Sequence, residues 1–206
     1  MKSLVNLSTD ADGIADFLSC LANLERKNSQ LFRSLSKKIV CFSVKPHLLL
    51  ISDGNDKHAA ILDDISEHIG NSKVKIKDCK RKLSVVCKNT EMILEKIKDK
   101  KEVTVKELLD YLELLESSGG AAQYLLVQAE TFLFMSEEIS RLYGMDFFKY
   151  NELLNEIVRD VEEHISILET IKKSLLDEQN RDQQKHPVFK YQNPDAWLTP
   201  ISGRED

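Results

Sequence analysis

Residues 18–39, LSCLANLERKNSQLFRSLSKKI, decide the fold, because a single carboxylate interrupts an otherwise apolar helical stripe. Counting by sevens from Glu25 reaches Leu18, Phe32 and Ile39, so on a helix the acid shares the inward face with large apolar side chains. A carboxylate buried without a cation, a metal or a hydrogen-bond donor costs an appreciable part of a domain's stability. We therefore expect Glu25 to have a partner elsewhere in the chain.

The composition predicts an all-α protein. Leu, Ile, Lys and Glu dominate the 206 residues, whereas there are only 7 Gly and 4 Pro. Pro46, a capping box at Thr104 and Glu107, and the glycines Gly70 and Gly144 mark helix boundaries. With the helical spacing of apolar residues, they predict helices over residues 9–40, 48–69, about 74–97, 104–115, 121–143 and 147–176.

We expect one helical bundle over residues 1–180, with residues 71–118 as a helical insertion, followed by an extended C-terminal tail, residues 181–206. The tail contains three of the four prolines and the only tryptophan. Its Phe189, Tyr191 and Trp197 make it too apolar for a plain disordered segment. The tail is therefore expected either to pack on its own bundle or to contact a protein partner or a second subunit.

The net charge of −5 is unevenly distributed. Residues 71–101 contain eleven Lys or Arg against four Asp or Glu, so the rest of the chain is strongly acidic. Such a basic segment suits nucleic acid, an anionic membrane or an acidic partner, but it is also typical of a solvated helix face. No aromatic residue alternates with these lysines, so a base-stacking surface is not indicated.

The cysteines and apolar segments bear on the compartment. No apolar run is long enough to span a bilayer and the N-terminus lacks an apolar signal segment, so we expect a cytoplasmic protein without a membrane contact. The four cysteines form no C-x-x-C pair. We interpret them as reduced structural thiols, disulfides being the alternative for a hyperthermophile.

Each other long helix also carries one metal-capable side chain near its midpoint. His58 and His164 each lie seven residues from an isoleucine on either side, and Glu130 stands among apolar residues at helical spacing. With Glu25, the expected inward order is Glu, His, Glu, His. These four residues are the candidate metal ligands.

That order resembles the ferritin-like di-iron carboxylate superfamily. The segments NLERKNSQLFRSL, DKHAAILDDI and VEEHISILE are similar to sequences of its rubrerythrin-like branch. The resemblance implies an antiparallel four-helix bundle with a long crossover between its second and third helices. It also implies a metal site built from two glutamates and two Glu-x-x-His motifs.

The chain departs from that motif at two positions. Asn55 and Val161 stand three residues before His58 and His164, where the family has glutamate. Nearby acids, Asp160 among them, are expected to point away from the inward line on a regular helix. A conventional di-iron site therefore lacks both of its bridging carboxylates.

Three arrangements of the four residues remain. In one, no metal is bound and hydrogen bonds pair Glu25 with His58 and Glu130 with His164. In the second, the four ligands hold one Fe, Mn or Zn ion. In the third, Asn55 or a shifted carboxylate completes a dinuclear centre.

The sequence leaves three functions open. The first is a ferritin-like protein with a decayed di-iron site that acts as a non-enzymatic structural or interaction protein. The second is a metal-binding rubrerythrin-like oxidoreductase or an iron- or oxidative-stress protein. The third is a nucleic-acid-associated protein that uses the lysine-rich insertion, in which Lys80, Arg81 and Lys82 are the residues to neutralise in a test. No catalytic residue is predicted, since nucleotide-binding, zinc-protease and hydrolase motifs do not occur.

Overall fold

The computed structural model describes residues 8–70, 79, 83–116 and 121–185, and the elements in these ranges are helical. They are α1 (Ser8–Lys38), α2 (Lys45–Ile69), α4 (Ser84–Lys98), α5 (Val105–Glu116), α6 (Ala121–Tyr143), the 3₁₀ turn η1 (Phe148–Tyr150) and α7 (Asn151–Lys185). Within them, one isolated bridge between Ile39 and Val103 is the only β-type pairing. The all-α prediction is confirmed.

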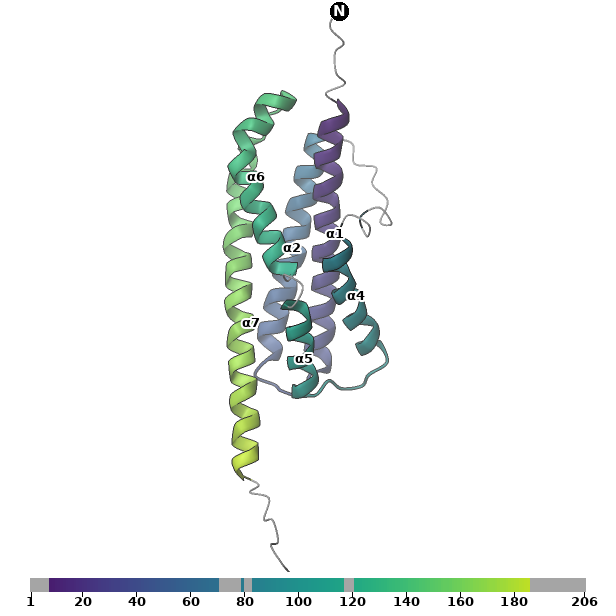
Figure 1. Ribbon diagram of the computed structural model, residues 1–206, viewed down its shortest axis with the longest axis vertical. Helices are drawn as coiled ribbons and strands as arrows, with labels where there is room; N and C mark the ends of the chain where they lie inside the picture. Colours follow the sequence, from purple (N-terminus) through teal and green to yellow (C-terminus); the bar gives the residue numbers. More distant parts are fainter. Residues whose placement is uncertain (1–7, 71–78, 80–82, 117–120, 186–206) are drawn as a thin grey trace, which may run out of the picture.

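Two antiparallel helix pairs form the body of the protein (Figure 1). One is the α1–α2 hairpin, and the other consists of α6 and α7. The chain direction of α1 matches that of α7, while α2, α5 and α6 run the opposite way. Because α5 precedes α6 along the same line and both contact α7, the two shorter helices together cover most of the length of α7.

Local sequence signals explain where these helices begin and end. Pro46 lies in the first turn of α2, where its missing N–H is not needed. The predicted capping box opens α5: the Glu107 N–H donates to Thr104 Oγ1 (3.2 Å), and the Thr104 N–H donates to Glu107 Oε2 (2.9 Å). Gly144 ends α6 with a left-handed backbone (φ 64°), whereas Gly70 ends α2 in an extended conformation.

Lys38, at the end of α1, contacts the C-terminal end of α4. This helix belongs to the crossover, the long connection between α2 and α6. Lys38 Nζ donates to the carbonyls of Ile97 (2.5 Å) and Lys98 (2.8 Å), at the C-terminus of α4, and of Lys100 (2.8 Å), two residues beyond it. The Val103 N–H in turn donates to the Lys38 carbonyl (2.8 Å). The ammonium thus adds a donor to carbonyls at and just beyond this helix end, and it complements the negative end of the helix dipole.

The interior consists of two apolar clusters with a polar layer between them. One cluster includes Leu18 and Leu24 of α1, and the other includes Leu31 and Ile39. The polar layer, which begins at the buried Glu25, occupies the part of α1 between the two clusters. The helix pattern therefore places the unusual carboxylate at the centre of the bundle rather than at one end.

Two predictions are wrong in detail. α7 continues to Lys185, beyond the expected end at Leu176 and into the segment assigned to the tail, because good helix formers without a breaker follow that leucine. Cys20 of α1 and Cys79 form a disulfide across 59 residues, so these two cysteines are not the reduced thiols that we expected.

Other predictions fall outside the described residues or are answered only in part. The basic residues 80–82, the start of the helix expected near residue 74, and residues 186–206 of the tail lie outside the described ranges. In the helices that the structure does describe, none combines the length and apolarity that a membrane span requires.

Candidate functional site at the centre of the bundle

The bundle brings three of the four predicted site residues together. Glu25 of α1, His58 of α2 and His164 of α7 are all buried, with exposed fractions of 2%, 0% and 6%. Glu130 is exposed on α6 and does not reach this group. The inward positions of α6 are instead Leu125, Ala129, Ser136 and Ile139.

Glu25 has hydrogen-bond partners on both of its oxygens. Its Oε2 lies 3.3 Å from His58 Nδ1, and its Oε1 accepts a hydrogen bond from Asn28 Nδ2 (3.1 Å). Asn28 Oδ1 accepts a further hydrogen bond from the Thr90 hydroxyl (3.1 Å), so α4 contributes to the same network. With the carboxylate as acceptor, His58 donates this hydrogen bond from Nδ1.

The other ring nitrogen of His58 faces a carboxylate that we had expected to point away. Asp160 Oδ2 lies 3.5 Å from His58 Nε2, which is buried and lacks a hydrogen bond in the described part of the chain. Lys57 Nζ lies 2.7 Å from both Asp160 Oδ2 and Glu156 Oε1. The expectation for Asp160 was wrong because this residue, four before His164, lies on the same side of α7 and borders the α2 interface.

Opposing effects set the pKa of Asp160. Partial burial acts to raise this pKa, but the hydrogen bond and charge of Lys57, with a smaller contribution from His58, outweigh burial and hold it below its usual value. Asp160 is therefore an ionised carboxylate at neutral pH, and Lys57 is its counter-ion.

His164 occupies its position because α2 has a glycine opposite it. A Cβ atom added at Gly54 would lie 2.3 Å from His164 Nε2, so only glycine lets the imidazole approach the α2 backbone this closely. The ring centroid of His164 is 5.4 Å from that of His58. Burial, together with the neighbouring His58, lowers the pKa of His164 to about 4, so this imidazole is neutral at pH 7.

This arrangement does not fit the metal site of the resembling family. In the described ranges, no group of three or more His, Cys, Asp and Glu side chains is placed to hold a metal ion. Glu25 is engaged by His58 and Asn28, and the charge of Asp160 is balanced by Lys57. Asn55 and Val161 are buried at the positions where the family has glutamate, and neither can replace a bridging carboxylate.

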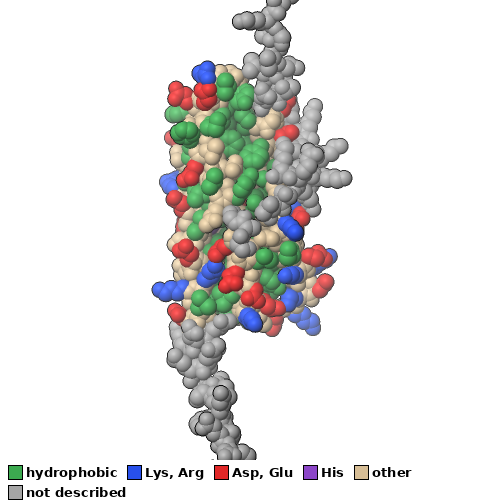
Figure 2. All heavy atoms as spheres, viewed as in Figure 1, with side chains coloured by type: hydrophobic (Ala, Val, Ile, Leu, Met, Phe, Trp, Pro, Cys, Tyr) green, Lys and Arg blue, Asp and Glu red, His purple; other side chains and the backbone are tan. Residues whose placement is uncertain are grey.

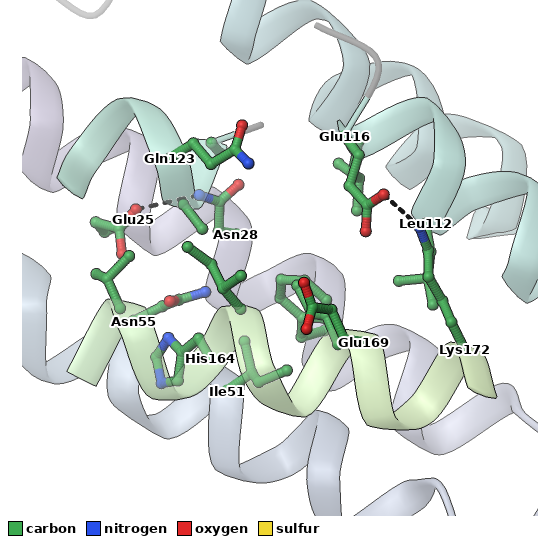
Figure 3. A pocket seen from close by; sticks show the side chains of 17 residues that line it. Glu25, Asn28, Ile51, Asn55, Leu112, Glu116, Gln123, His164, Glu169 and Lys172 are labelled. Carbon is green, nitrogen blue, oxygen red and sulfur yellow. Dashed lines mark hydrogen bonds and ion pairs between the residues drawn. The ribbon is translucent and has the colours of Figure 1, made fainter. Parts of the chain in front are cut away.

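A cavity of about 320 Å³ adjoins this polar layer. Figure 3 shows Glu25, Asn28, Asn55 and His164 near one another. Glu116, Glu169 and Lys172 lie on the other side of the cavity from Glu25 and Asn28. Apolar side chains of α1, α5 and α7, including Phe32, Leu112, Leu115, Ile165 and Leu168, form much of the remaining wall. No local sequence signal indicates this cavity, because it arises where α5 ends and α6 begins against α7.

No protein-family model, curated protein or solved structure matches this chain.

Proposed function

We propose that this chain is a non-enzymatic structural or interaction protein on a ferritin-like scaffold whose di-iron centre has decayed. One observation carries this proposal: the central Glu25 is hydrogen-bonded to His58 and Asn28 rather than left available as a metal ligand. A carboxylate that accepts hydrogen bonds from neighbouring side chains needs no metal ion to offset the cost of its burial.

The ferritin-like part of the proposal is supported by topology. Two antiparallel pairs, α1–α2 and α6–α7, are separated by a long connection that contains α4 and α5. A single long crossover between the second and third main helices is typical of ferritin-like bundles. The missing motif carboxylates and the exposed Glu130 then favour loss of the metal centre on a retained scaffold.

The metal-binding oxidoreductase is the second candidate, because one observation favours it. His58 Nε2 is a buried nitrogen without a hydrogen bond among the described residues, and a metal ion would satisfy it. Against this candidate, Asp160 is paired with Lys57, and no third ligand is in place among the residues that the structure describes.

Metal content separates these two candidates. The chain, purified without chelators and loaded anaerobically with Fe(II), Mn(II) or Zn(II), is analysed by elemental mass spectrometry with Glu25→Ala and Glu130→Ala. We expect no stoichiometric metal in any of them. About one or two equivalents that Glu25→Ala loses and the exposed control Glu130→Ala keeps would establish the metalloprotein instead.

The outer face of α6 is the best-supported interaction surface of this proposal. Val127, Phe134, Met135 and Leu142 are exposed on it, Phe134 to 91%. Hydrophobic side chains gather on this side of the molecule (Figure 2). An apolar face of this kind on one helix marks a contact with another molecule, and we name it the α6 face.

A second copy of the chain is the occupant that we propose for the α6 face. Phe134 lies near the middle of α6, so a two-fold contact between antiparallel α6 helices would bring the two Phe134 rings together. Arg141 pairs with Glu138 on the same helix, which reduces charge repulsion between two such faces.

The oligomeric state tests this contact. By light scattering coupled to size-exclusion chromatography, we expect a dimer for the wild type and a monomer for Phe134→Glu. Leu50→Glu, the same kind of change at an exposed leucine of α2, should stay dimeric. A wild type that is monomeric at about 100 µM would refute self-association through the α6 face, because the dissociation constant of any dimer would then lie above this concentration.

A chain shortened after Lys185 addresses the predicted role of the tail in the same assay. If the shortened chain loses the dimer while Phe134→Glu keeps it, self-association depends on the tail and not on the α6 face.

A further inference from the structure

Two polar side chains line the inner end of the cavity. Asn55 and His164 are 5% and 6% exposed, and both line the cavity. Among the described residues, neither side chain makes a hydrogen bond. Neither side chain is among the buried polar atoms that the structure leaves shut off without a partner, because both face the cavity, where a bound molecule can hydrogen-bond to them.

The polar side chains at the inner end of the cavity determine which head group a ligand can place there. Glu25 offers two carboxylate oxygens that each accept one hydrogen bond from the protein and can accept another. The amide oxygen of Asn55 is a further possible acceptor. The pKa of His164, lowered to about 4 by burial, keeps this ring uncharged at pH 7, so it cannot serve as a cation for an anionic ligand.

The rest of the cavity selects an apolar body and disfavours an anion. Phe32, Leu112, Ile165 and Leu168 offer carbon surface along the wall. At the other end, Lys172 is paired with Glu116, while Glu169 adds a second carboxylate. The charged groups that line the cavity are thus three carboxylates and one ammonium, a net negative set.

We propose that this cavity binds a small organic amine. Its ammonium group donates hydrogen bonds to Glu25 and Asn55, and its hydrocarbon body lies along the apolar wall towards Lys172. The volume of about 320 Å³ is near the lower end of the range for small-molecule pockets, so the ligand is small. This binding site is independent of self-association through the α6 face, which lies on other residues.

Three probes of equal length test the head group. Hexylamine is protonated at neutral pH like a lysine side chain, hexan-1-ol is neutral, and hexanoate is an anion. Saturation-transfer NMR and calorimetry on the full chain should detect hexylamine binding, weaker hexan-1-ol binding and no hexanoate binding. Absence of hexylamine binding, or equal binding of hexanoate, would overturn the proposal.

Matched variants place the probe in the cavity. Leu168→Trp fills the apolar wall and should abolish hexylamine binding, whereas Leu176→Trp, the same change at a half-exposed position of α7, should leave it unchanged. Asn55→Leu removes a polar partner of the head group and should weaken binding by about tenfold or more.

The variants also test whether hexylamine binds outside the cavity. Circular dichroism checks that each variant remains helical, and if Leu168→Trp fails to fold, Asn55→Leu decides the outcome. Hexylamine that binds Asn55→Leu and every folded cavity variant as tightly as the wild type would show that it binds elsewhere, which contradicts the proposal.

Discussion

At the scale of single residues, substitutions test the contact between Gly54 and His164 directly. Alanine favours a helix over glycine by about 1 kcal/mol, so Gly54→Ala would ordinarily stabilise α2. Here the new methyl group would meet the buried imidazole at 2.3 Å. We expect a net loss of about 1–3 kcal/mol in the free energy of unfolding, measured by urea denaturation.

The same substitution should change sign when the ring is removed. In a His164→Ala background the methyl group has space, so adding Gly54→Ala should raise stability by about 0.5–1 kcal/mol. A stabilising Gly54→Ala in the wild-type background would mean that His164 does not pack against α2 at this position.

The sequence predicted the inward positions of Glu25, His58 and His164 correctly, but it also predicted an inward position for Glu130, which is exposed. Glu25, His58 and His164 each sit on a single apolar stripe, so counting by sevens finds the inward face. α6 carries apolar residues on more than one face, and the count around Glu130 selected a face that is exposed. The contact of Asp160 with His58 was not predicted, because Asp160 lies at the edge of the interface between α2 and α7. At such an edge, a residue outside the inward line of its helix still reaches the neighbouring helix.

At the scale of helices, the elements were predictable where local chemistry sets them. Pro46, Gly144 and the Thr104–Glu107 capping box each act within a few residues, so sequence alone locates them. The end of α7 was not predictable from apolar periodicity, because its last turns up to Lys185 are polar and depend on helix propensity.

The capping box predicts an acid-sensitive start of α5. The hydrogen bond from Lys100, with those from the Thr104 backbone and hydroxyl, lowers the pKa of Glu107 from 4.5 to about 2. Because this pKa is lower in the folded chain, the stabilisation is complete above pH 4.5 and disappears as the pH falls through about 2.

Urea unfolding as a function of pH checks this contribution. At neutral pH, Glu107→Gln should be less stable than the wild type, and the difference should shrink as the pH falls from 4.5 to about 2. Glu113→Gln, at an exposed position of the same helix, is the control. A difference between Glu107→Gln and wild type that is independent of pH would show that the carboxylate charge does not stabilise the cap.

At the scale of the whole molecule, the order of helices followed from the sequence, but the links between distant segments did not. The long connection that contains α4 and α5 could be expected from its length and helix signals. The disulfide could not, because Cys20 and Cys79 are 59 residues apart and nothing in their neighbouring sequence indicates a pair. The cavity likewise depends on how α5 and α6 meet α7.

The disulfide should make the stability of the bundle depend on redox conditions. It joins α1 to the crossover, and closing a loop of this length restricts the unfolded chain by an amount worth about 4 kcal/mol in the chain-entropy description. We expect a reductant to lower the free energy of unfolding of the wild type by about 2–4 kcal/mol.

Replacing both cysteines tests whether the bond itself is responsible. The double variant with Cys20→Ser and Cys79→Ser should unfold like the reduced wild type and should not respond to the reductant, whereas Cys87→Ser keeps the bond and should respond. Peptide mass spectrometry of the oxidised wild type should recover the fragments around Cys20 and Cys79 as one linked species. A wild type whose unfolding is the same with and without reductant would mean that α1 and the crossover are held together by apolar packing alone, since both sulfurs lie within the cluster that contains Leu18 and Leu83.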